Sequence, residues 1–200
     1  MRPIVFLIFI GFSFPAFAQV SLDDLDAAAD KSSSSMEEYQ KRLNDPDPDR
    51  ALAVLRILIG QGDADQRRLA IRHGLQSTDR ALQATTVRAI LDSEPTLRVV
   101  FDPVDNEPTV HYSRTVTGAG GVIDATGNGS VTFKITGYDA NEECWTHTRY
   151  DTCILRMRGD EVNMLFGSSW GAYRLNATGQ LEGEQAIEQN LAKAFIDLSE

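Results

Sequence analysis

One short segment of the chain has the sequence pattern that surrounds many catalytic serines. Residues 167–171 read Gly-Ser-Ser-Trp-Gly and follow an apolar run typical of a strand. In serine hydrolases with this pattern, the serine lies on a sharp turn between a strand and a helix, and the histidine of the triad comes later in the chain. Here residues 172–175 have strand character, and His73, His111 and His147 all precede the serines. We therefore interpret the segment as a turn between two strands. We name no catalytic residue and rank a small hydrolase as the least favoured function.

The residue types that bind metals do not have the spacing of a metal site. The three histidines form neither an H-x-H nor an H-x-x-x-H pair. Asp45, Asp47 and Asp49 alternate as in the loop of an EF-hand, but Arg50 and Arg56 occupy the positions where that loop needs Gly and Glu. We therefore predict no metal ion and no cofactor.

The chain contains two cysteines, Cys144 and Cys153. An even number of cysteines in an oxidising compartment indicates a disulfide, and eight intervening residues are enough for a hairpin turn. Cys144 and His147 also have C-x-x-H spacing, which leaves zinc as an alternative. A structural zinc site usually has four ligands, and the chain offers no second pair of this kind. We predict a Cys144–Cys153 disulfide.

Tyrosine and tryptophan are concentrated in the second half of the chain. Of the seven such residues, only Tyr39 lies in the first half. Exposed rings of this kind stack on sugars or form hot spots for protein partners, because a flat ring buries a large area with little loss of entropy. The alternative is that these rings form the core and edges of a sheet. Our candidate binding residues are Trp145, Tyr150, Trp170 and Tyr173.

The N-terminus has the features of a signal peptide over residues 1–18. Arg2 supplies a positive charge, residues 4–14 are almost wholly apolar, and Ala16-Phe17-Ala18 forms a small-x-small cleavage pattern. The apolar run is too short to span a membrane, which takes about 20 residues. We predict cleavage between Ala18 and Gln19, export to the periplasm or the medium, and no membrane span.

The charge balance excludes one class of partner. The chain has 19 Lys and Arg against 29 Asp and Glu, a formal net charge of −10. Nucleic-acid affinity depends on neutralising phosphates with basic side chains. A chain with this excess of acidic residues is therefore a poor nucleic-acid binder. The 42% hydrophobic content is enough to build a core, so the chain is expected to fold.

Residues 19–95 are expected to form a helical module. Asp47 before Pro48 and Asp63 before an apolar run are typical helix starts. Ser35 is expected to begin a further helix with a capping box, and Ser77 is expected to begin the last helix of the module. Residues 60–62 (Gly-Gln-Gly) are expected to end the helix that starts at Asp47, in a left-handed cap. Short loops would make these helices antiparallel hairpins.

Part of this module is similar to a known repeat. Residues 65–75 and 87–91, with the sequences Asp-Gln-Arg-Arg-Leu-Ala-Ile-Arg-His-Gly-Leu and Val-Arg-Ala-Ile-Leu, resemble HEAT-type helical repeats, and the resemblance covers about residues 47–92. It implies a scaffold that contacts proteins rather than an enzyme. The alternative is a small helical bundle packed on the other half of the chain.

Residues 96–182 change to a period of two. Val131, Phe133 and Ile135 alternate with polar residues, as a half-buried strand requires. Residues 97–101, 110–116, 144–148, 153–158, 162–166 and 172–175 are further predicted strands. Short strands separated by Gly-rich turns predict an antiparallel sheet, closed as a small barrel or folded as a sandwich.

Residues 183–200 are expected to return to a helix. Ile187, Leu191, Phe195 and Leu198 would lie on one face of it. The expected fold class is therefore α+β, with N-terminal helical hairpins, an antiparallel β module and a C-terminal helix.

These observations predict an exported, non-catalytic binding or adaptor protein that engages a protein partner. A module that binds cell-surface glycans is the alternative.

Overall fold

The computed structural model describes residues 21–104, 108–147 and 152–198. The predicted signal peptide and its cleavage site, like Tyr150, lie outside the described residues. The described chain divides into two units, one ending at Ser35 and one beginning at Met36. Among the described residues, no helix is long and apolar enough to cross a membrane.

The first unit contains the N-terminal part of helix α1 (Leu22–Leu43). Its side chains are exposed throughout residues 21–35. The helix starts at Ser21, whose hydroxyl oxygen accepts the backbone N–H of Asp24 at 3.1 Å. The predicted helix start at Ser35 is wrong, because α1 continues through it and the Ser35 hydroxyl donates to the Lys31 carbonyl at 3.0 Å.

The second unit begins with the remainder of α1 and three short helices. These are α2 (Pro48–Gln61), α3 (Ala64–Leu75) and α4 (Arg80–Asp92). Each begins at an aspartate whose carboxylate accepts backbone N–H groups of the first turn: Asp47, Asp63 and Asp79. The expected start of α4 at Ser77 is therefore displaced by two residues. Helix α2 does end at Gly62, but with φ −68° this residue is extended rather than left-handed.

The three helices pack against one another around a small apolar core. Helices α3 and α4 approach closely at Gly74, where an added Cβ would overlap the Thr86 side chain. Arg67 on α3 fixes the ends of the other two helices, because its guanidinium donates to the Ile59 carbonyl at 2.5 Å and to the Ser93 hydroxyl at 2.8 Å. Burial lowers the pKa of Arg67.

The rest of the second unit is a closed antiparallel barrel of eight strands. Its strands are, in chain order, β1 (Thr96–Pro103), β3 (Gly129–Asp139), β4 (Cys144–His147), β5 (Thr152–Arg158), β6 (Glu161–Phe166), β7 (Ser169–Leu175), β8 (Gln180–Ile187) and β9 (Asn190–Asp197). The sheet follows the order β1-β9-β8-β7-β6-β5-β4-β3 and closes through pairing of β1 with β3. The two-residue strand β2 (Val122–Ile123) pairs with the start of β3. The barrel confirms the α+β class and selects the barrel over the sandwich.

The predicted C-terminal helix is wrong. Residues from 180 to 197 form strands β8 and β9, which complete the barrel and pair with β7 and β1. The inward side chains of β9 are Ala192, Ala194 and Ile196, whereas Leu191 on the expected helix face is exposed. The β module therefore extends past the expected boundary at residue 182.

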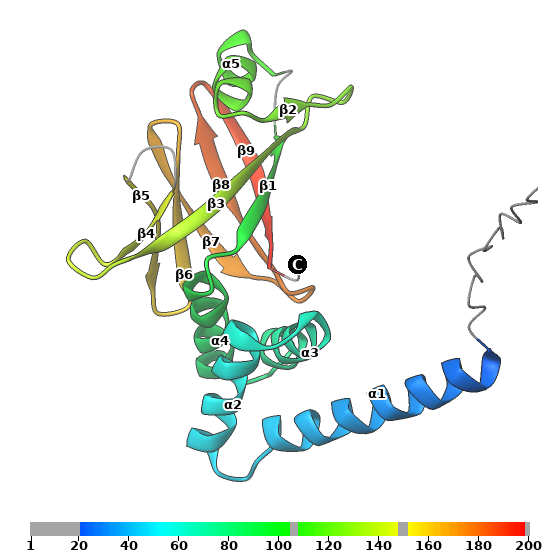
Figure 1. Cartoon of the computed structure of the whole chain (residues 1–200). Coiled ribbons are helices and arrows are strands. Elements are labelled where there is room, and N and C mark those ends of the chain that lie inside the picture. The colour runs from blue at the N-terminus through cyan, green and yellow to red at the C-terminus, as the bar shows by residue number, and fades with distance from the viewer. Residues whose placement is uncertain (1–20, 105–107, 148–151, 199–200) are drawn as a thin grey trace, which may run out of the picture. The chain divides into compact units, whose positions relative to one another are not determined.

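The predicted strand at 110–116 is also wrong, because this segment forms helix α5 (Val110–Gly118). Thr109 is its N-cap, and its hydroxyl oxygen accepts the N–H of Tyr112 at 3.1 Å. Tyr112 and Val116 are both buried, one turn apart, so the apolar residues serve a helix. Figure 1 shows α5 at one end of the barrel and α2–α4 at the other.

The predicted disulfide is confirmed. Cys144 and Cys153 are bonded, with their Cα atoms 5.5 Å apart, and they join the neighbouring strands β4 and β5. The register of this strand pair shifts between Trp145 and Thr146.

Candidate functional site

The candidate site is a cavity at the end of the barrel beside α5, which we call the barrel mouth. Two contacts hold the start of α5 in place. The Tyr112 hydroxyl donates to the Phe101 carbonyl at 3.3 Å, and the Thr109 hydroxyl donates to Asn190 Oδ1 at 2.7 Å. Asn190 is buried at the β8–β9 turn, so α5 is tied to both strand β1 and that turn.

The middle of α5 reaches the neighbouring turns. The Thr115 hydroxyl lies 3.4 Å from Glu188 Oε1, in the turn between β8 and β9. Gly167, in the turn between β6 and β7, has a positive φ of 62°, and a Cβ added there would lie 3.3 Å from the Thr115 methyl group. Helix α5 therefore crosses the edge of the barrel towards β6.

The cavity lies between α5 and strands β3 to β6 and has a volume of about 350 Å³. Its apolar lining is Ala119, Phe133, Ile154, Leu165 and Phe166. Its polar side chains are Thr115, His147 and Thr152. Gly118 and Gly167 also line it, with backbone atoms. This volume and mixture fall within the range of small-molecule sites, which are mainly apolar with a few polar groups.

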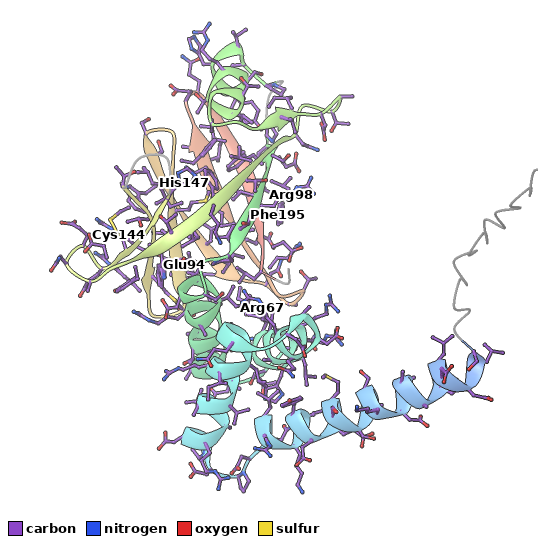
Figure 2. The ribbon with its side chains drawn as sticks, in the orientation of Figure 1. Arg67, Glu94, Arg98, Cys144, His147 and Phe195 are labelled. Atoms are coloured by element: carbon purple, nitrogen blue, oxygen red, sulfur yellow. A yellow bond between two sulfur atoms is a disulfide. The ribbon has the colours of Figure 1, made fainter. Side chains whose placement is uncertain are left out.

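The rings of the lining continue an aromatic cluster from inside the barrel. Phe101 stacks on Phe166 with ring centres 4.6 Å apart. Phe133 meets Phe166 edge to face at 6.0 Å and 74°, and meets His147 in the same way at 5.5 Å and 82°. Figure 2 shows His147 at the end of β4 that lies nearer α5, and Cys144 at the other end.

Among the ten described residues around the cavity there is no Asp, Glu, Lys or Arg, and His147 is the one imidazole. His111 is exposed on α5 and does not line the cavity. A single imidazole beside two threonine hydroxyls does not make the pair of opposed titratable groups from which acid–base catalysis is built. The arrangement is suited to binding.

The Gly-Ser-Ser-Trp-Gly segment is a hairpin, as expected. Phe166 pairs with Ser169, so Gly167 and Ser168 form the turn and β7 follows. No helix follows the serines, and the geometry of a catalytic elbow is therefore not present.

The three described residues among the four aromatic residues selected from the sequence do not come together. Trp145 is 1% exposed, and its indole N–H donates to Asp92 Oδ1 at 3.0 Å. Tyr173 lies inside the barrel, where its hydroxyl donates to Gln185 Oε1 at 3.0 Å and burial raises its pKa. Trp170 is 43% exposed on the outer face of β7, beneath the guanidinium of Arg156, which lies 5.1 Å from the ring centre. Trp145 and Tyr173 therefore serve the core, and Trp170 is the one available at the surface among the three described.

The sequence did not identify the residues of the barrel mouth as a site. His147 is weighed from the sequence as a zinc ligand and as a catalytic histidine, and Phe133 as a core residue of a strand. Thr115 fell within a segment expected to be a strand. The signal that could have corrected this is Thr109, a good N-cap residue followed by Tyr112 and Val116 at helical spacing.

A second hollow lies along α2 and α4 and differs in character. Arg56, Gln61, Arg88 and Asp92 are among its lining residues, and none of its apolar side chains is larger than alanine. Charges of both signs without a large apolar side chain favour a solvated groove. In the described part of the chain, no group of three or more His, Cys, Asp or Glu side chains could hold a metal ion.

Comparison of the chain with family models, with curated proteins and with solved structures found no match. The resemblance of residues 47–92 to HEAT repeats therefore stays a prediction. Function has to be inferred from the geometry of the barrel mouth.

Proposed function

We propose that the chain is an exported, non-catalytic binding protein and that the barrel mouth is its binding site. The observation that carries the proposal is the cavity itself, which is open to solvent and mainly apolar, and whose described lining residues include no carboxylate, lysine or arginine. Apolar surface exposed to water in a concave site is stabilised when a ligand covers it. The mouth therefore takes an apolar group, and a protein partner that presents such a group is the favoured source.

A binding site is effective when the groups around it are held in place before the ligand arrives. Here the cavity is built on strands of a closed barrel, and α5 is fixed by Tyr112 and by the buried Asn190. The disulfide joins β4 to β5, the two strands that carry His147 and Thr152. These constraints favour a preformed site.

The surface-glycan function remains the second candidate, and it depends on Trp170. This ring is 43% exposed, and Asn163 and Ala172 are paired on the adjacent strands β6 and β7. An exposed indole with an amide nearby is typical of sugar-binding surfaces, although the Arg156 guanidinium covers one part of the ring.

The test is to fill the mouth without disturbing the fold. Gly118 ends α5 and lines the cavity, and a Cβ added there meets no atom within 4 Å, so Gly118→Trp should place an indole in the mouth. Gly60 is the matched control, because it too is helical, has open space beyond it and lines the other hollow. Each variant is exported, cross-linked in place, purified and analysed by mass spectrometry for bound proteins and small molecules, with thermal unfolding as a check of folding.

We expect the bound species to be lost in Gly118→Trp and retained in Gly60→Trp. Loss in Trp170→Ala alone would transfer the function to the outer face and favour the glycan candidate. If every species bound to the native chain were also bound to the Gly118→Trp variant, the barrel mouth would not be the binding site.

A further inference from the structure

We infer that the group bound in the barrel mouth is a single uncharged aromatic ring or fused ring pair carrying one polar substituent, as in phenol or indole. This inference rests on the proposed function, because it specifies the ligand of the same site. It follows from three independent features of the cavity: its size, the orientation of its rings and its charge.

The size of the cavity limits the ligand to one ring system. An apolar cavity of about 150 Å³ is enough to bind benzene. The mouth, at about 350 Å³, is roughly twice as large. It therefore has room inside for one bicyclic ring, or for one six-membered ring with a short substituent, and any larger part of a ligand would have to lie outside it.

The orientation of the rings favours an aromatic ligand over an aliphatic one. Phe133 and Phe166 both line the cavity, and their planes lie 74° apart. A third ring that lies parallel to one of them therefore meets the other edge to face. Offset stacking and edge-to-face contact are the two favoured arrangements of aromatic pairs, so one ligand ring satisfies both at once. An aliphatic group would gain only the contact area.

The charge of the described lining favours an uncharged ligand. Among the lining residues that the structure describes, there is no Lys or Arg to pair an anion and no Asp or Glu to pair a cation. Transfer of an unpaired charge into such a site carries a large desolvation penalty. The Thr115 hydroxyl, which donates to Glu188, can instead accept from one neutral polar group, and the Thr152 hydroxyl can donate or accept, so a phenol O–H or an indole N–H fits the lining.

The experiment titrates isotope-labelled full-length mature protein with five probes and follows the backbone amides by NMR. Phenol and indole represent the proposed ligand. Cyclohexanol is the aliphatic match to phenol, benzoate is the anionic match, and benzylammonium is the cationic match. We expect phenol and indole to shift the amides around the cavity and to bind at least ten times more tightly than the other three. The Gly118→Trp variant should abolish these shifts.

Phe133→Leu tests the ring itself. Leucine keeps an apolar side chain at the wall but removes the aromatic face, so phenol and indole should bind about 2- to 13-fold more weakly, the range expected for one aromatic pair. The binding of cyclohexanol should not change. Phe101→Leu is the matched control, because Phe101 stacks on Phe166 from inside the barrel and does not line the cavity. It should lower stability and leave binding unchanged.

The outcomes separate this inference from the proposed function. If cyclohexanol bound as tightly as phenol and Phe133→Leu had no effect, the mouth would be a general apolar site; the proposed function would stand and the aromatic ligand would be wrong. Equal binding of benzoate or benzylammonium would contradict the requirement for a neutral ligand. If no probe bound, while a partner was still lost in Gly118→Trp, the inference alone would fail.

A final arm identifies the source of the ring. The capped amino acid N-acetyl-tryptophanamide carries the indole as a protein does. Tighter binding of this probe than of indole would assign the ring to a side chain of a partner protein. Weaker binding would assign it to a free small molecule.

Discussion

The indole N–H of Trp145 on β4 donates a hydrogen bond to Asp92 Oδ1 at the end of α4, across 3.0 Å. This bond connects the barrel to the helices that precede it in the chain. Arg88, one turn earlier on α4, completes the connection, because its guanidinium lies 5.5 Å from the Trp145 ring centre and 4.9 Å from that of Tyr138. A tryptophan that sequence reasoning assigned to a binding surface thus joins two parts of the same fold.

The first prediction concerns this bond. Asp92→Ala should lower the free energy of unfolding by about 1–3 kcal/mol, because it leaves a buried indole N–H without an acceptor. Asp92→Asn keeps an acceptor oxygen and should cost less. Urea unfolding, followed by tryptophan fluorescence, measures both. Equal stability of Asp92→Ala and the native protein would show that the bond contributes nothing.

A second prediction compares two helical glycines. Gly74→Ala should destabilise the protein by about 1–3 kcal/mol, because the new methyl group would overlap Thr86 between α3 and α4. Gly60→Ala meets open space in α2 and should stabilise the protein by up to about 1 kcal/mol, since alanine is the better helix former. Thermal unfolding of the two variants should therefore shift in opposite directions. Shifts of the same sign would contradict the close approach of the two helices.

The third prediction concerns the disulfide. Replacing both Cys144 and Cys153 with alanine should lower the free energy of unfolding by about 2–3 kcal/mol, the value expected for closing a loop of this length in the unfolded chain. Unfolding of the native protein with and without a reductant provides the second measurement. If the reductant altered the stability of the alanine variant too, the effect would not come from this bond.

The fourth prediction is a loss of stability at alkaline pH. Burial raises the pKa of Tyr173, and desolvation is also the main cause that raises the pKa of Tyr112. The unfolded chain therefore releases these phenolic protons first. The free energy of unfolding should keep the tyrosine contribution below about pH 10, the ordinary tyrosine pKa, and lose it as the pH rises above that value.

Phenolate absorbance tests this directly. Tyr112 and Tyr173 should ionise only when the protein unfolds. Tyr173→Phe should reduce the alkaline loss, and it should cost about 1–2 kcal/mol at neutral pH, because Gln185 Oε1 loses its buried donor. Ionisation of all tyrosines in the folded protein would contradict the burial.

Local rules were enough to predict the helices α2 and α3 and the disulfide. Asp47 and Asp63 cap helices because a short carboxylate can reach the free N–H groups of the first turn, whatever lies around it. Cys144 and Cys153 are close in sequence and lie on paired strands, so their bonding needs no distant part of the chain.

Tertiary structure decided the segments whose apolar residues fit two periods. Ile187, Leu191 and Phe195 have helical spacing, but Ala192, Ala194 and Ile196 fit a strand equally well. Pairing of β9 with both β8 and β1 decides between them, because it satisfies the backbone of three strands and closes the barrel. The reverse happened over residues 110–118, where the Thr109 cap and the buried pair of Tyr112 and Val116 stabilise a helix.

The residues of the barrel mouth could not be predicted as a site from the sequence. Its residues come from α5 and from four strands, spread from Thr115 to Gly167, and they share no local pattern. They meet because β3 to β6 pair in succession and α5 is held across the same end of the barrel by Phe101 and Asn190. The sequence by itself determined the helix caps, the disulfide and the alternation of the strands, because these depend on near neighbours. Strand pairing and the docking of α5 bring distant residues together, and only this tertiary structure forms the cavity.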